Sequence, residues 1–218
     1  MQSELDTKRL SLIIVFAALA IALNPTFTYI GFNFPLANGL IFQIWEIPIV
    51  VAFLIISPMA GLVISLINTA VLFAIFPGVL PTGPAYNLSA TLSMQIGIFG
   101  AVMIAKKISC PKHQNTNVLF QPKWVILATA MGILTRVAVM SIILFFALPQ
   151  PSPIGFSFPL QATIGYLPFA AIFNATLALY TISIGFVIAE RVQKVLHLTL
   201  PQQAKCTMDL PTKKIKIV

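Results

Sequence analysis

The sequence predicts an all-α integral membrane protein, a bundle of about six transmembrane helices, from its composition, its apolar runs and the placement of its basic residues. Of the 218 residues, 58% are hydrophobic and 8% are charged, whereas a soluble domain carries about 25% charged residues. A soluble fold this apolar would have too little polar surface to cover its core. The bilayer is therefore the expected solvent for most of the chain.

Apolar runs separated by proline, glycine or charged residues give the expected spans. The first covers residues 10–23 and ends at Asn24-Pro25, because a proline disfavours helix at the residue before it. A cleaved secretory signal peptide is the alternative for this run, since its length and the Ala20-Ile21-Ala22 tripeptide fit one. The other five spans are expected at residues 45–56, 62–76, 87–104, 124–148 and 161–188.

The second span is short for a bilayer, which requires about 20 helical residues. It is expected either to begin near Gly39 or to be tilted or kinked at Pro48. Residues 25–42, which precede it, combine proline and glycine with phenylalanine and tyrosine. This composition predicts an aromatic outer loop, or lid, between the first and second helices.

The basic residues predict the orientation in the membrane. Six spans place twelve of the thirteen Lys and Arg residues on one side, together with both termini, and leave only Arg136 within the bilayer. Basic loops mark the inner side, so both termini are expected in the cytoplasm and the protein in the cell membrane. The expected organisation is a membrane domain at residues 1–194 and a basic cytoplasmic tail at 195–218. This sorting argues against nucleic acid as the partner of the net charge of +8.

Catalytic and metal-binding patterns are missing from the sequence. Both histidines, His113 and His197, and both cysteines, Cys110 and Cys206, fall in segments expected in the cytoplasm. There are no paired acids within the spans, no metal cluster and no phosphate-binding Gly-Lys-Ser loop. The chain is therefore not expected to be an enzyme, to bind a metal or to hydrolyse ATP itself.

Polar side chains within the spans are the candidate binding residues, because a polar group in a bilayer normally faces the bundle interior or a wet cavity. Asn87, Thr91 and Gln95 recur at every fourth position and so share one helix face. A pocket in the outer half of the bundle is the functional interpretation, and hydrogen bonding between helices is the alternative. The predicted substrate-binding residues are Trp45, Glu46, Asn68, Asn87, Thr91, Gln95, Arg136 and Asn174.

Two further features have a structural and a functional interpretation. Arg136 lies about twelve residues, or roughly 18 Å, from the nearer end of its helix, too deep to reach water easily. It either contacts substrate or is held by carbonyl groups or a partner subunit. On the first span, Ser11, Ala18 and Ala22 form a narrow face of small residues, which suits the docking of another helix.

Several short motifs, in order along the chain, resemble the S components of energy-coupling factor (ECF) vitamin transporters. The first span, residues 9–22, is similar to the family's first helix with its A-x-x-x-A docking motif. W-E-I-P at residues 45–48 and S-P-M-A-G-L at 57–62 resemble the family's D-I-P … G-P-L-A-G signature. R-V-A-V-M at 136–140 and Y-L-P-F at 166–169 are closest to the riboflavin-type branch.

The resemblance implies a subunit that captures a vitamin with high affinity from outside the cell. It also implies a transmembrane coupling subunit, which would dock on Ser11, Ala18 and Ala22, and two cytoplasmic ATPases that use the ATP. This chain has Leu144 and Asn174 where the riboflavin-type pattern has an Asn and a Lys that are expected to touch the flavin ring, which argues against riboflavin itself and leaves a related flat heterocyclic vitamin or precursor as the candidate substrate. The alternative function is a stand-alone small permease or a membrane assembly subunit without a vitamin site.

Overall fold

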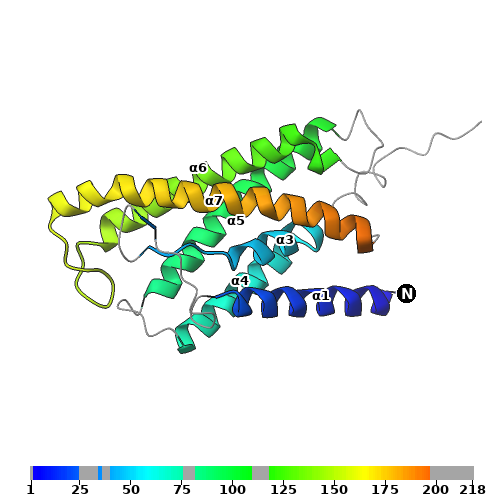
Figure 1. Ribbon diagram of the computed structural model, residues 1–218, viewed down its shortest axis with the longest axis horizontal. Coiled ribbons are helices and arrows are strands. Elements are labelled where there is room, and N and C mark those ends of the chain that lie inside the picture. The colour runs from blue at the N-terminus through cyan, green and yellow to red at the C-terminus, as the bar shows by residue number, and fades with distance from the viewer. Residues whose placement is uncertain (1, 25–33, 36–39, 76–81, 110–117, 197–218) are drawn as a thin grey trace, which may run out of the picture.

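The chain forms a helical bundle in the computed structural model, which describes residues 2–24, 34–35, 40–75, 82–109 and 118–196 (Figure 1). The described part contains no β-strand, which confirms the all-α prediction. Each of the six predicted spans falls on one helix. The helices are α1 (Gln2–Ala22), α3 (Glu46–Ile55), α4 (Pro58–Ile75), α5 (Gly83–Ser109), α6 (Pro122–Ala147) and α7 (Leu160–Leu196), with a 3₁₀ turn, η1, at Val118–Phe120.

Four of the described helices, α4, α5, α6 and α7, are long and apolar enough to cross a membrane. Their outer surfaces carry large apolar side chains, and Ile96 of α5 and Ile126 of α6 are 67% and 68% exposed. Many such side chains on long apolar helices fit hydrocarbon, where the helix satisfies its own backbone hydrogen bonds. The protein is therefore a multi-pass membrane protein.

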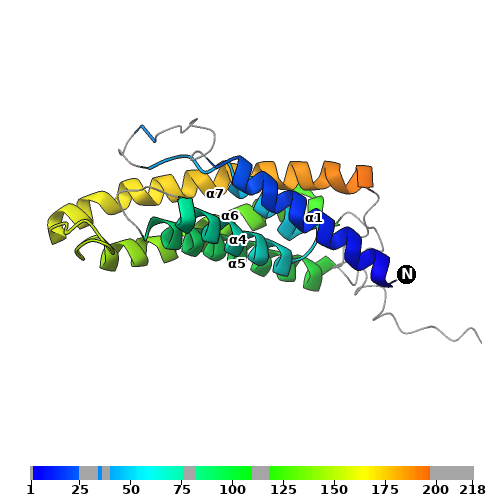
Figure 2. The same cartoon turned by 90° about the horizontal axis from the view of Figure 1, so that it is seen from below.

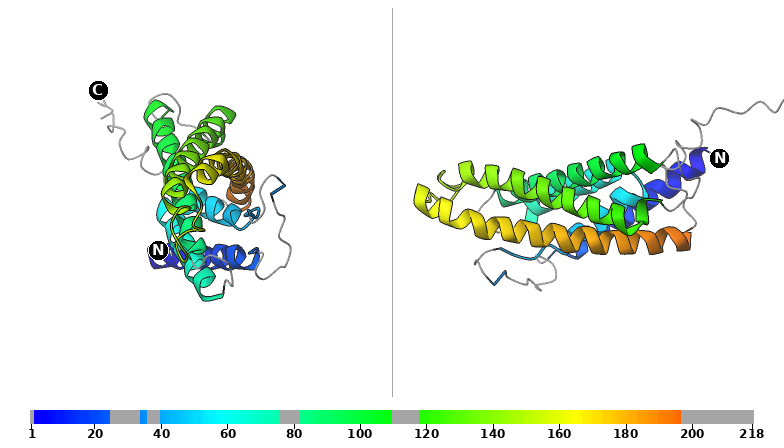
Figure 3. Two further views of the ribbon diagram at one scale, coloured as in Figure 1. Left: turned by 90° about the vertical axis from the view of Figure 1, so that its left-hand side faces the viewer. Right: turned by 90° about the horizontal axis from the view of Figure 1, so that it is seen from above.

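The helices pack around a central α3. Helix α6 lies between α5 and α7, while α3 contacts α1, α4 and α7. Figures 2 and 3 show α1 along the outside of the bundle. The start of α1, the end of α5, the start of α6 and the end of α7 lie at one end (Figure 1), which we call the basic end. Its basic residues on these helices are Lys8, Arg9, Lys106, Lys107, Lys123, Arg191 and Lys194.

Helix α3 is shorter than a membrane span. It has 10 residues, about 15 Å at the helical rise, and all of them except Ile47 are buried. The expectation that it begins near Gly39 is wrong, because residues 40–45 are not helical. The apolar character of this segment reflects burial among protein side chains rather than contact with lipid. Helix α3 therefore occupies only the half of the bundle nearer the basic end (Figure 1).

A short cap turns the chain from α3 into α4. The hydroxyl oxygen of Ser57 accepts a hydrogen bond from the backbone N–H of Ala60 at 3.1 Å. Pro58 is the first residue of α4, where its missing N–H leaves no helical hydrogen bond unmade. The predicted break at this Ser-Pro sequence is therefore a tight turn between two helices.

Two helices extend beyond their predicted spans. Helix α1 begins at Gln2, because its polar first turns contain good helix formers although hydropathy begins only at Leu10. Helix α7 continues to Leu196, past the expected domain boundary at residue 194, and the Glu190–Lys194 ion pair of 2.6 Å supports its last turns. The rest of the predicted tail, and most of the aromatic outer loop, lie outside the described residues.

Helices α5 and α6 approach closely at Gly97. A Cβ atom at this position would lie 2.5 Å from the backbone carbonyl oxygen of Met131, which is too close for any side chain. Small residues at such crossings let the backbones of membrane helices approach each other. This close approach brings α5 and α6 together at Gly97, on the side of Gln95 that is nearer the basic end.

Candidate functional site

A cavity of about 640 Å³ lies in the half of the bundle away from the basic end. The start of α5, the end of α6, the start of α7, residues 40–45 and the α6–α7 loop supply most of its walls. Its volume falls within the range of about 300–1,000 Å³ that is usual for small-molecule sites.

The cavity walls are largely apolar and rich in aromatic side chains. Leu144 and Met140 of α6 contribute aliphatic surface. The aromatic lining residues, apart from Trp45, are Tyr86, Phe156, Phe158, Tyr166 and Phe173. Beside the cavity, the Phe34 and Phe173 rings pack edge to face with centroids 5.3 Å apart. Phe34 and Phe42 are the two aromatic residues of the predicted outer loop that fall within the described residues, and the Phe42 ring also lies near Phe173.

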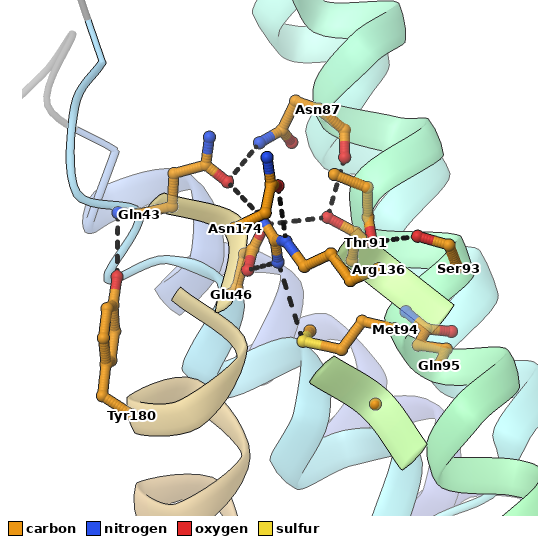
Figure 4. Close-up of polar contacts among 12 residues, drawn as sticks. Gln43, Glu46, Asn87, Thr91, Ser93, Met94, Gln95, Arg136, Asn174 and Tyr180 are labelled. Carbon is orange, nitrogen blue, oxygen red and sulfur yellow. Dashed lines mark hydrogen bonds and ion pairs between the residues drawn. The ribbon is translucent and has the colours of Figure 1, made fainter. Parts of the chain in front are cut away.

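A buried ion pair next to the cavity joins α6 to α3 (Figure 4). The Nη1 of Arg136, on α6, lies 2.5 Å from Oε2 of Glu46, the first residue of α3, and neither side chain is exposed. The hydroxyl of Thr91, on α5, donates to the other carboxylate oxygen at 3.1 Å. A buried pair of charges is tolerated when further hydrogen bonds satisfy both groups, as here.

Arg136 sets the orientation of the amides around it, because a guanidinium can only donate hydrogen bonds. Its Nε donates to Oδ1 of Asn174 at 3.1 Å, and its Nη2 donates to Oε1 of Gln43 at 3.1 Å. The same Gln43 oxygen accepts from Nδ2 of Asn87 at 2.8 Å. Tyr180 fixes the backbone of this segment, since its hydroxyl oxygen accepts from the N–H of Gln43 at 3.0 Å. Figure 4 shows these side chains converging from four parts of the chain.

Four of the eight predicted substrate-binding residues line the cavity: Trp45, Asn87, Arg136 and Asn174. Glu46 and Thr91 do not line it and instead hold Arg136 from below. For Arg136, the structure shows a carboxylate partner within the same chain, which was not among the expected partners. Arg136 is also among the lining residues of the cavity, although its side chain is fully buried.

The two remaining predicted residues lie deeper in the bundle. Nε2 of Gln95 donates to the hydroxyl of Ser65, on α4, at 2.8 Å, so this amide joins two helices. Asn68, also on α4, is buried, and its Oδ1 accepts no hydrogen bond within the described part of the chain. Neither residue contributes to the cavity lining. The geometry thus favours a helix-packing role for Gln95.

Sequence reasoning missed Gln43, Tyr86, Tyr166 and the α6–α7 loop. Gln43 precedes α3 in a segment expected to be a span boundary, and no periodicity marks it. Loop residues enter the cavity because the chain folds back there, and the hydroxyl of Tyr86 donates to the carbonyl of Ile154 at 2.5 Å. Leu144 and Asn174, the two positions singled out by the family resemblance, both line the cavity.

The small-residue face of α1 points away from the bundle. Ser11, Ala18 and Ala22 are exposed, and Val15 continues the same stripe between them. The opposite side of the helix, including Ala20, is buried against the core cluster. The predicted docking residues are thus accessible to a partner chain.

No protein-family model matches the chain, and neither does any curated protein sequence. A solved structure does match, with a TM-score of 0.66 over 88% of this chain and 98% of the other, at 21% sequence identity. That structure is described as the "Structure and mechanism of the S component of a bacterial ECF transporter". The chain therefore shares its fold with an S component of a bacterial ECF transporter.

Proposed function

We propose that the chain is the substrate-capture subunit of an ECF-type importer and takes up a vitamin or a related small heterocycle across the cell membrane. The observation that carries the proposal is the aromatic cavity of about 640 Å³ within an S-component fold. An apolar cavity with a few convergent polar groups is the usual form of a small-molecule site. In this proposal the chain is not an enzyme and holds no cofactor.

The proposed partners are a transmembrane coupling subunit and two cytoplasmic ATPases, which use the ATP. The exposed stripe of Ser11, Val15, Ala18 and Ala22 on α1 supports this part of the proposal, because small residues allow another helix to approach closely. Among the described helices, α1 packs mainly against α3 and α4.

Purification of the tagged full chain from its native membranes tests the proposed function. We expect the coupling subunit and both ATPases in stoichiometric amounts, and a small molecule that mass spectrometry detects after the protein is denatured. Recovery of the chain with bound small molecule but without ATPases would favour a stand-alone permease. Recovery with neither would favour an assembly subunit.

We also propose that both termini are cytoplasmic, which places the cavity in the outer half of the membrane. Ser152 lies in the exposed α6–α7 loop at the cavity end. In a Ser152→Cys variant with Cys110 and Cys206 replaced by serine, a membrane-impermeant maleimide is expected to label intact cells. A chain that keeps only Cys110 is the control and should be labelled only after lysis. The opposite labelling pattern would reverse the orientation.

Asn87 and Gln95 offer a matched comparison, since they are two turns apart on α5 but only Asn87 reaches the cavity. Asn87→Leu is expected to weaken retention of the copurified small molecule about 5- to 150-fold, the effect of one lost buried hydrogen bond of about 1–3 kcal/mol. Gln95→Met should lower the unfolding midpoint and leave retention unchanged. Equal losses of retention in both variants would show that the site extends below the ion pair.

A further inference from the structure

The described residues of the cavity lining offer no uncompensated charge to a ligand. Arg136 is the sole charged residue among the described residues that line it, and Glu46 neutralises its charge at 2.5 Å. Four of its five N–H groups are already directed at Glu46, Gln43, Asn174 and the sulfur of Met94. An anionic ligand would thus find one N–H without an acceptor, on a side chain that is itself fully buried, and a cationic ligand would find no carboxylate among the described lining residues. A charge buried without a partner is strongly disfavoured.

The hydrogen bonds of Gln43 and Asn87 determine which of their amide atoms remain free to bind a ligand. Because Oε1 of Gln43 faces Arg136, the Nε2 amide group of Gln43 is left as a donor, and it makes no hydrogen bond to the described part of the chain. Because Nδ2 of Asn87 faces that same oxygen, Oδ1 of Asn87 is left as an acceptor. These two side chains hydrogen-bond to each other and both line the cavity, so neighbouring residues of its wall supply one free donor and one free acceptor.

A third group points to a ligand independently. Trp45 is 6% exposed and lines the cavity, and its buried Nε1–H has no acceptor within the described residues. A buried donor without an acceptor costs free energy, so a bound molecule that supplies one is favoured. Aromatic rings on the walls, such as Tyr86 and Tyr166, provide flat apolar contact area.

We propose that the cavity binds an uncharged, flat heterocycle whose edge carries a lactam, a ring N–H next to a ring C=O. The ring N–H donates to Oδ1 of Asn87, and the C=O accepts from Nε2 of Gln43. A second acceptor on the ligand receives the indole N–H of Trp45. This inference rests on the proposed function, because it specifies the chemical class of the captured substrate.

Four matched probes test this class by calorimetry on the purified full chain: quinolin-2-one, its N-methyl derivative, its 4-carboxylate and its 4-aminomethyl derivative. Quinolin-2-one is expected to bind about tenfold more tightly than the N-methyl compound, which lacks the donor. It is also expected to bind about 100-fold more tightly than either charged compound. Tighter binding of a charged probe, equal binding of the N-methyl probe, or no binding of any probe would overturn the proposal.

Variants assign the two ends of the lactam to their partners. In Asn87→Leu the tenfold penalty of N-methylation should disappear, because its acceptor is gone. Gln43→Met should weaken quinolin-2-one but keep the penalty, and Gln95→Met, whose amide lies outside the cavity, should change neither. A penalty that persists in Asn87→Leu would contradict the assignment. Copurification of the ATPases tests the proposed function and does not depend on these binding measurements. The two proposals can therefore be contradicted independently.

Discussion

Replacing Arg136 by methionine is expected to destabilise the protein by about 3–5 kcal/mol, because it leaves the Glu46 carboxylate buried without its cation. The carboxylate is completely buried and, within the described part of the chain, would keep the hydroxyl of Thr91 as its one side-chain hydrogen-bond donor. The amides of Gln43 and Asn174 would also lose the donor that orients them. Unfolding in mixed micelles measures the change in free energy.

The double variant Glu46→Leu/Arg136→Met separates the ion pair from the packing. Removing both charges together is expected to recover most of the lost stability, since apolar side chains of similar size often replace a buried pair at little cost. The exposed Glu190–Lys194 pair is the control, and Glu190→Gln should cost less than about 1 kcal/mol. A double variant as unstable as Arg136→Met would show that the two charges are not energetically coupled.

Substitution of both Ala18 and Ala22 by tryptophan is expected to abolish assembly with the proposed coupling subunit. Each bulky side chain inserted into a packed contact costs about 1–3 kcal/mol, so the pair should weaken association roughly 30-fold or more. Both positions are exposed in the isolated chain, so its own fold should tolerate the change. The measurement is the amount of ATPase recovered per tagged chain.

Ile126→Trp is the matched control for that experiment. Ile126 is 68% exposed on α6, outside the small-residue stripe of α1, and tryptophan there should leave ATPase recovery unchanged. Retention of the copurified small molecule should be unchanged in all variants of this set, because the cavity does not include α1 residues 11–22. Full recovery of ATPases by the double tryptophan variant would place the docking surface elsewhere.

Hydropathy and breakers located all six α-helices of the described residues, because the bilayer requires long apolar runs and Ser-Pro or Asn-Pro sequences end them. The same signal misjudged helix α3. A segment that is apolar because protein surrounds it has the composition of one that is apolar because lipid surrounds it. Hydropathy cannot distinguish these cases, and only the helix length of 10 residues indicates burial.

The sequence predicted which helix face carries the candidate site, but not how far along the helix the site extends. The stripe of Asn87, Thr91 and Gln95 does face the interior, yet successive members are about 6 Å further from the cavity end. Only Asn87 reaches the cavity; Thr91 meets the ion pair and Gln95 meets α4. The Glu46–Arg136 pair joins residues 90 positions apart. Its existence depends on how α3 and α6 are placed relative to each other, which no local pattern encodes.

Because α3 extends through only half of the bundle, we expect the half that contains α3 to open less readily than the half that contains the cavity. Around α3, residues such as Ile49, Val50 and Ala52 are at most 1% exposed, so that side chains there have partners on every side. The cavity wall is less buried, since Phe156 is 47% exposed and Asn87 and Tyr166 are half-buried, so its side chains make fewer dispersion contacts. Local opening should therefore begin at the start of α5 and the α6–α7 loop, whose amides should exchange with solvent deuterium before those of α3. A ligand that fills the cavity would slow exchange there and leave the α3 half unchanged.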